Sequence, residues 1–147
     1  MDLKLIAEEN LTLVERGSYT GPSGSAVPLR DLVDASVRGT VLYRPNDFDS
    51  LPLSSPSTSP RRIEVTAETT ANAARRLYES GARHIALLNF ASARNPGGGF
   101  IRGAKAQEED LARCSALYQC LMTQPRILFF SPSPTFDVVL GPYDLFA

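Results

Sequence analysis

The stretch Ile85-Ala86-Leu87-Leu88-Asn89-Phe90-Ala91 is a nearly continuous apolar run of the length of a strand. Such a run is typical of a strand that is covered on both faces. Residues 62–66 alternate as a second strand, and residues 67–80 place apolar side chains at helical spacing before a stop at Gly81. Strand, helix and strand in this order predict a parallel α/β sheet. Because ligands bind beyond the carboxyl ends of strands in such sheets, we expect a functional site in the loop after Ala91.

The rest of the chain predicts shorter elements around this unit. Residues 2–16 have the spacing of an amphipathic helix, and residues 17–29 predict a hairpin that turns at Gly21-Pro22-Ser23-Gly24. Residues 40–43, 127–130 and 138–140 each predict a short strand. Residues 50–60 are rich in Ser and Pro and predict a solvated loop within a single domain that spans residues 1–147.

Composition excludes several classes of protein. The 147 residues, 43% hydrophobic, suffice for one core without disulfides or a structural metal. A net charge of −1 argues against a protein that coats duplex nucleic acid. No run approaches the ~20 apolar residues of a membrane helix, and the charged N-terminus does not resemble a secretory signal, so we expect an intracellular protein, cytoplasmic or, in a eukaryote, nuclear.

Few residues offer metal or nucleophilic chemistry. Cys114 and Cys120 lie six apart without a partner cluster, which favours two reduced thiols over a zinc site. His84, the single histidine, stands before the apolar run and is best explained as a solvated or hydrogen-bonded residue at a strand end. We therefore expect neither a metal nor a cofactor.

The loop over residues 92–106 contains Arg94, Arg102 and Lys105 and no acidic residue. Within it, Gly97, Gly98 and Gly99 lack Cβ atoms, so their N–H groups can converge on an anion such as a diphosphate. A glycine run alone would indicate only a flexible turn. Its position after a strand, its charge and the helix that follows favour the anion site.

Gln107-Glu108-Glu109-Asp110 opens the next helix, whose apolar positions extend to Leu121. Acids in a first turn are stabilised by the helix dipole, which is the purely structural explanation. Their place seven residues after the glycine triplet favours a chemical role as well. Neighbouring helical side chains point about 100° apart, so Glu108 and Glu109 are unsuited to flank one bond from opposite sides. We therefore expect one of the two glutamates to take part in the chemistry and the other to hold the ligand.

The triplet, the seven-residue spacing and Gln107-Glu108-Glu109 together resemble the hallmark of poly(ADP-ribose) glycohydrolases. The microbial-type branch is matched in particular by Leu88-Asn89-Phe90-Ala91-Ser92-Ala93-Arg94-Asn95-Pro96, by Leu111-Ala112-Arg113, and upstream by Tyr19-Thr20-Gly21-Pro22-Ser23-Gly24, Leu42-Tyr43-Arg44-Pro45 and Ile63-Glu64-Val65-Thr66. The resemblance implies a macrodomain-like three-layer α/β/α sandwich with an N-terminal helical extension. It also implies hydrolysis of ribose–ribose O-glycosidic bonds in poly(ADP-ribose), with release of ADP-ribose.

On this resemblance Glu109 is the acid that protonates the departing ribose oxygen and Glu108 grips the ribose hydroxyls. The implied substrate-binding residues are Gly97, Gly98, Gly99, Asn89, Asn95, Phe100 and Gln107. The implied partners are poly(ADP-ribose) or ADP-ribosylated proteins, with no duplex nucleic acid and no membrane.

The C-terminal residues after Phe130 depart from the family pattern, so we expect the sandwich to be incomplete on that side. One alternative function is a shortened ADP-ribose-binding module without catalytic activity. A second takes Gly97, Gly99 and Gly103 as a dinucleotide fingerprint for a nicotinamide enzyme. This fingerprint is poor, because no suitable acid follows about 20 residues later.

Overall fold

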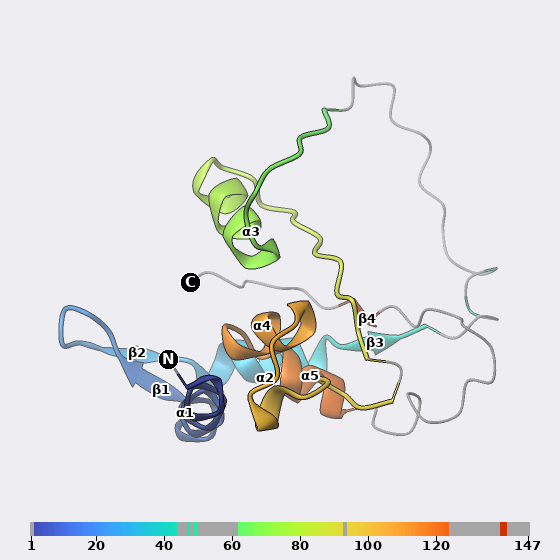
Figure 1. Ribbon diagram of the computed structural model, residues 1–147. Helices are drawn as coiled ribbons and strands as arrows, with labels where there is room; N and C mark the ends of the chain where they lie inside the picture. The colour runs from blue at the N-terminus through green and yellow to red at the C-terminus, as the bar shows by residue number, and fades with distance from the viewer. Residues whose placement is uncertain are drawn as a thin grey trace.

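The computed structural model describes residues 2–43, 47, 49, 62–92, 94–123 and 139–140 (Figure 1). It begins with the expected helix, α1 (Leu3–Arg16). The carboxylate of Asp2 caps it by accepting from the Lys4 N–H at 2.9 Å. Gly17 ends it in the left-handed region at φ 75° and donates to the Leu13 carbonyl. The sequence prediction for this segment is confirmed.

The predicted hairpin is also present. Strands β1 (Ser18–Thr20) and β2 (Ala26–Pro28) pair antiparallel, with Tyr19 opposite Val27. In the turn between them, the Gly24 N–H donates to the Gly21 carbonyl at 2.9 Å, and Gly24 adopts φ 79°. The tight turn that the sequence predicted at residues 21–24 is therefore present.

Helix α2 (Arg30–Arg38) follows the hairpin, and the sequence analysis missed it. Leu29 precedes the helix and makes no side-chain cap, so the usual start signal is absent. A weaker signal was available, because Asp31 stands in the first turn, Arg38 in the last turn and Gly39 at the end.

The two-stranded ladders in the described residues are both antiparallel. Strand β3 (Val41–Leu42), within the predicted segment 40–43, pairs with β4 (Val139–Leu140), within the predicted segment 138–140. The Ser/Pro loop over residues 50–60 and the strand predicted at residues 127–130 lie outside the described residues.

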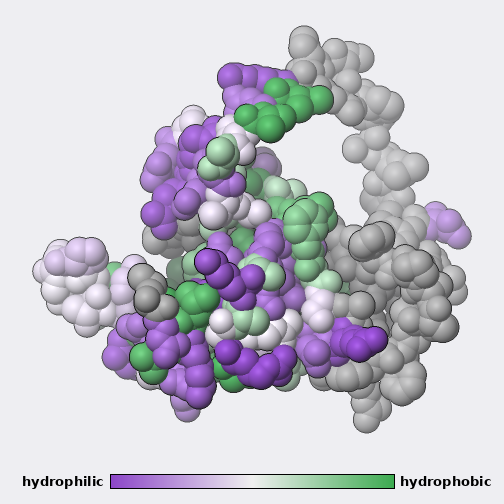
Figure 2. Space-filling view, in the orientation of Figure 1, coloured by the Kyte–Doolittle hydropathy of each residue, from purple (hydrophilic) through white to green (hydrophobic). Residues whose placement is uncertain are grey.

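The segments 62–66 and 85–91 do not form the predicted parallel sheet, because no described segment pairs with either of them. Both lack assigned secondary structure and flank helix α3 (Thr70–Glu79), as Figure 1 shows. Burial of the second segment alternates: Ile85, Leu87 and Asn89 are partly covered, whereas Leu88 and Phe90 are 72% and 71% exposed. The expectation of a strand covered on both faces is therefore wrong for the described residues. Figure 2 shows hydrophobic surface along these segments.

Helix α3 lies within the predicted helical segment 67–80 but begins at Thr70, three residues later than predicted, and ends at Glu79. The Thr69 hydroxyl accepts from the Asn72 N–H at 3.2 Å, and Gly81 follows the helix at φ 101°. The Arg76 guanidinium donates to the Glu68 carboxylate at 2.7 Å and fixes the entry into the helix. The helix lies against helix α4 (Gln107–Arg113).

The single helix expected from Gln107 to Leu121 is divided into α4 and α5 (Leu117–Met122). The Ser115 hydroxyl causes the break: it donates to the Leu111 carbonyl at 2.7 Å and accepts from the Leu117 N–H at 3.2 Å. A serine that competes in this way for backbone groups ends one helix and starts the next.

The core lies on both sides of α4. One buried cluster joins Ala7 of α1 to Phe100 and Ala112, and the other contains Leu111, Leu117 and Leu121. Phe100 begins the short 3-10 helix η2 (Phe100–Arg102), which Gly103 ends at φ 74°. A Cβ at Gly103 would lie 2.8 Å from the backbone nitrogen of Lys4, so this turn lies directly against the first turn of α1. No helix of the described residues is long and apolar enough to cross a membrane.

Candidate active site

The two glutamates at the start of α4 are buried. Glu108 is 3% exposed and Glu109 is 7% exposed, beside the half-exposed Asp110. All three acids stand in the first turn of α4, where the helix dipole stabilises negative charge. Two adjacent carboxylates with so little solvent contact would be costly without hydrogen-bond donors, and the preceding loop provides those donors.

Glu108 closes the loop that follows the segment 85–91. Its Oε2 accepts from the Ser92 N–H at 2.8 Å and its Oε1 accepts from the Gly97 N–H at 3.2 Å. The two donors stand at the beginning of the loop and at the glycine triplet, so one carboxylate fixes both ends of residues 92–97.

Burial raises the pKa of the Glu108 carboxyl above its ordinary value of 4.5, and the nearby charge of Glu109 raises it further. The N–H groups of Ser92 and Gly97 and the side chain of Asn89 hydrogen-bond the carboxylate and lower the pKa, but burial remains the largest effect. The site therefore favours a protonated Glu108 more than water does.

Glu109 is held through one oxygen only. Its Oε1 accepts from the Gly99 N–H at 2.8 Å, whereas its Oε2 is buried and has no hydrogen-bond partner. The Oδ1 of Asn89 is likewise buried without a partner. Buried polar atoms are normally hydrogen-bonded, so two unused acceptors in one site are suited to a proton and to hydroxyl groups of a ligand.

Each glycine of the triplet is required by a different neighbour. A Cβ at Gly97 (φ 70°) would lie 2.6 Å from the Tyr118 ring, and one at Gly99 would lie 2.5 Å from the Ala104 Cβ. A Cβ at Gly98 (φ 59°) would collide with the carboxylate of Glu109 and lie 3.0 Å from Glu108 Oε2. Close approach explains all three glycines, and the positive φ of Gly97 and Gly98 favours glycine there as well.

The triplet N–H groups all donate within the chain. Gly97 and Gly99 donate to the two glutamates, and Gly98 donates to the Asn95 carbonyl at 2.9 Å. In the structure, the N–H groups of Gly97 and Gly99 are thus occupied by two side-chain carboxyl groups. Its binding of a diphosphate stays a prediction.

The structure places the remaining predicted residues differently. The Asn95 side chain is exposed, while its backbone N–H donates to the Ser92 hydroxyl at 3.2 Å. Phe100, expected at the substrate, has no exposed surface, and its ring lies 5.0 Å from that of Tyr118 in the core. The Phe100 ring therefore packs in the core, and its expected contact with substrate stays a prediction. His84 is exposed, and both cysteines are free.

Gln107 contacts the segment that precedes the loop. Its Oε1 accepts from the Phe90 N–H at 2.9 Å, and its Nε2 donates to the Leu88 carbonyl at 2.7 Å and to the Thr70 hydroxyl at 3.1 Å. The residue that the sequence assigned to substrate binding therefore joins α3, α4 and residues 88–90.

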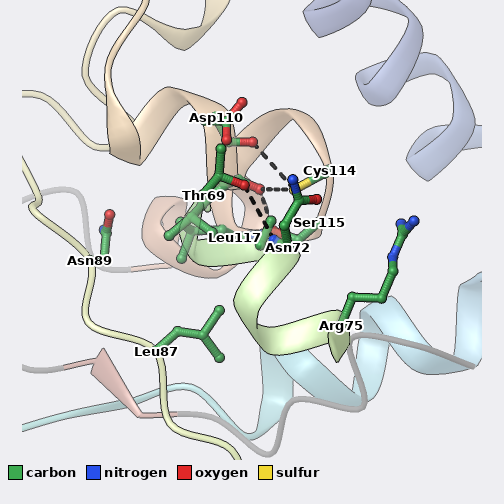
Figure 3. Close-up of a pocket in the computed structure, with 11 residues that line it drawn as sticks. Thr69, Asn72, Arg75, Leu87, Asn89, Asp110, Cys114, Ser115 and Leu117 are labelled. Atoms are coloured by element: carbon green, nitrogen blue, oxygen red, sulfur yellow. Dashed lines mark hydrogen bonds between the residues drawn. The ribbon is translucent and has the colours of Figure 1, made fainter. Parts of the chain in front are cut away.

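A cavity of about 330 Å³ lies beside the glutamates, between α3 and the α4–α5 pair (Figure 3). Asn89 and Leu87 line one side and Arg75 of α3 lies across from them, whereas neither Glu108 nor Glu109 lines it. Asn89 is therefore shared between the cavity and the carboxylate cluster.

Two residues of the site were missed as candidates from the sequence. Ser92 turns the loop, since its hydroxyl accepts from two backbone N–H groups while its own N–H donates to Glu108. The Arg113 guanidinium donates to the Ala104 carbonyl at 2.8 Å and ties the end of the loop to α4. A serine just before a turn is a recognisable signal, but nothing local indicates the partner of Arg113.

The loop also carries positive charge. Arg94, Arg102 and Lys105 are exposed and form no ion pair with another described residue.

In the described part of the chain, no group of three or more His, Cys, Asp or Glu residues is arranged to hold a metal ion.

Comparison with known proteins gives consistent matches. The family model of the microbial-type PARG catalytic domain matches residues 7–133. The crystal structure of poly(ADP-ribose) glycohydrolase from Thermomonospora curvata is 50% identical, with a TM-score of 0.78, and the match covers 86% of this chain and 47% of that chain. The same enzyme bound to the inhibitor ADP-HPD matches at 50% identity and a TM-score of 0.76, over 86% of this chain and 45% of that one. A comparison with curated proteins gives no match.

The chain thus spans about half the length of the solved structures it matches. At this identity the match also shows the fold, which is the mixed helix-and-strand architecture of a macrodomain-like glycohydrolase. The predicted fold class is confirmed at this level. The chain belongs to the family of microbial-type poly(ADP-ribose) glycohydrolase catalytic domains.

Proposed function

We propose that this chain hydrolyses ribose–ribose O-glycosidic bonds in poly(ADP-ribose) and releases ADP-ribose. The observation that carries the proposal is the state of Glu109: a buried carboxylate whose Oε1 is fixed by the Gly99 N–H and whose Oε2 has no partner. A general acid needs such a positioned, unused oxygen. The family and its solved members support the substrate class.

In the proposed reaction, Glu109 gives its proton from Oε2 to the departing ribose oxygen as the bond from that oxygen to the anomeric carbon breaks. The electron pair of the bond leaves with the oxygen, and positive charge develops on the sugar ring. The resulting carboxylate then takes a proton from the water that attacks the anomeric carbon. Glu109 is protonated again, and two hydroxyl-bearing products leave.

The neighbouring groups would hold the substrate. Each oxygen of Glu108 accepts one backbone N–H, and the carboxylate keeps further lone-pair capacity for a ribose hydroxyl. The unpartnered Oδ1 of Asn89 offers another acceptor. Arg94, Arg102 and Lys105 supply positive charge for the diphosphate, and we propose that poly(ADP-ribose) or ADP-ribosylated proteins are the partners.

The test compares Glu109→Gln with Glu9→Gln, a control on an exposed position of α1. We expect Glu109→Gln to abolish release of ADP-ribose from poly(ADP-ribose), while calorimetry still detects binding of ADP-ribose. Glu9→Gln should leave both unchanged. Release by Glu109→Gln at the wild-type rate would refute the role of Glu109. Binding of ADP-ribose without any release by the wild type would replace the enzyme with a binding module.

A further inference from the structure

The side chain of Gln107 makes three hydrogen bonds within the chain, and both of its N–H donors are used. An amide has one acceptor oxygen and two N–H donors. The oxygen accepts from Phe90, and the nitrogen donates to Leu88 and to Thr70, at 2.7–3.1 Å. A ligand that accepted a hydrogen bond from this amide would have to displace Leu88 or Thr70.

The two backbone groups bound by Gln107 flank Asn89. The Leu88 carbonyl and the Phe90 N–H are the pair that one residue of a neighbouring parallel strand would engage. No described segment forms a ladder with residues 88–90, and the side chains of Leu88 and Phe90 are exposed. The Gln107 side-chain amide therefore makes the two hydrogen bonds to residues 88–90 that the backbone of a neighbouring strand would make.

Asn89 is held from two consecutive residues of α4. Gln107 fixes the backbone on either side of it, while the Asn89 side chain lies close enough to Glu108 to lower the pKa of that carboxyl. The bond to Thr70 adds the first residue of α3 to the same arrangement. The orientation of the free Asn89 Oδ1 then depends on the Gln107 amide.

We propose that Gln107 is a positioning residue, whose amide fixes residues 88–90 and so orients Asn89 beside Glu108 for the substrate. This inference rests on the proposed function for its catalytic consequence. Its structural part, the hold on the Phe90 N–H, stands on the contacts alone.

The first experiment measures amide hydrogen exchange at Phe90. Gln107→Leu should raise the exchange rate by roughly threefold to tenfold, the loss expected for one hydrogen bond. Gln107→Glu keeps the acceptor for the Phe90 N–H and should raise it less. Gln119→Leu, an amide of α5 whose Oε1 has no partner, is the matched control and should leave it unchanged. Equal exchange in wild type and Gln107→Leu would overturn the inference whether or not the chain is an enzyme.

The second experiment asks whether Gln107 acts through Asn89. We expect Gln107→Leu and Asn89→Ala each to lower kcat/KM for ADP-ribose release by about tenfold, with ADP-ribose affinity lowered in parallel. The double mutant should lie within about twofold of Asn89→Ala alone, because residues that act as one unit are not additive. Additive losses would contradict the proposal. If the wild type releases nothing, the proposed function fails, and the same cycle is measured on ADP-ribose affinity.

Discussion

Replacement of Gly98 by alanine should damage the site far more than it damages the fold. Gly98 has φ 59°, a conformation that costs an L residue about 1–2 kcal/mol. Its new methyl group would also collide with the carboxylate of Glu109 and lie 3.0 Å from Glu108 Oε2. Because the backbone fixes the position of the new methyl group, the carboxylate side chains have to shift away from it.

Gly24→Ala isolates the backbone part of this effect. Gly24 has φ 79° and nothing within 4 Å of the added Cβ, so only the backbone conformation should cost free energy, about 1 kcal/mol. Gly98→Ala should lose a further ~1–2 kcal/mol, because displacement of Glu109 breaks its bond to the Gly99 N–H inside a buried site. We therefore expect total losses of about 1 and about 2–3 kcal/mol for the two variants.

Urea unfolding measures these free energies, and m-values equal to that of the wild type would show that the unfolded states are comparable. Release of ADP-ribose, measured where each variant is fully folded, gives the effect on the site. We expect Gly24→Ala to retain wild-type turnover and Gly98→Ala to lose about a hundredfold, the scale of a 1 Å misplacement of a reacting group. Equal stability and equal turnover for Gly98→Ala and Gly24→Ala would refute the idea that the glycine makes room for the carboxylates.

Two further predictions concern Glu108 of α4 and Gly99 of the glycine triplet. Glu108 has a folded-state pKa above its ordinary value of 4.5, so its contribution to stability is fully present below pH 4.5 and is lost as the pH rises through the raised value. Urea unfolding over this range should therefore show the wild type losing stability relative to Glu108→Gln, and a constant difference would contradict it. Gly99→Ala has an ordinary φ of −100° but places a Cβ 2.5 Å from Ala104, at an expected cost of about 1–3 kcal/mol. Addition of Ala104→Gly should recover most of that loss in the same assay, whereas no recovery would rule out this contact as its cause.

Local signals in the sequence predicted the elements that carry their own start and stop. Helix α1 has Asp2 and Gly17 at its ends, the hairpin has its Gly-Pro turn, and α3 is bounded by Thr69 and Gly81. Helix α2 has no side-chain cap and was missed. The break between α4 and α5 depends on the Ser115 hydroxyl, which an apolar spacing pattern cannot show.

The candidate site was predicted in its location but not in its internal contacts. The loop after residues 85–91 and the short spacing between the triplet and the acids were predicted from the sequence, whereas the burial of Glu108 and Glu109 was not. The pairing of particular N–H groups with particular carboxylates depends on how the loop folds back over ten or eleven residues, which spacing alone does not specify. The burial of Phe100 against Tyr118 and the engagement of Gln107 with residues 88–90 have the same origin.

The contact between Gly103 and Lys4 links the thermal behaviour of two distant parts of the chain. The first turn of a helix frays at lower temperature than its centre, and segments that contact it open in the same step. Because the backbone of Lys4 lies against the turn that ends η2, fraying of α1 removes one wall of the loop that carries Gly97, Gly98 and Gly99. Heating would then disorganise the glutamate cluster by local opening, and the proposed release of ADP-ribose would fall at temperatures where most of the chain is still folded.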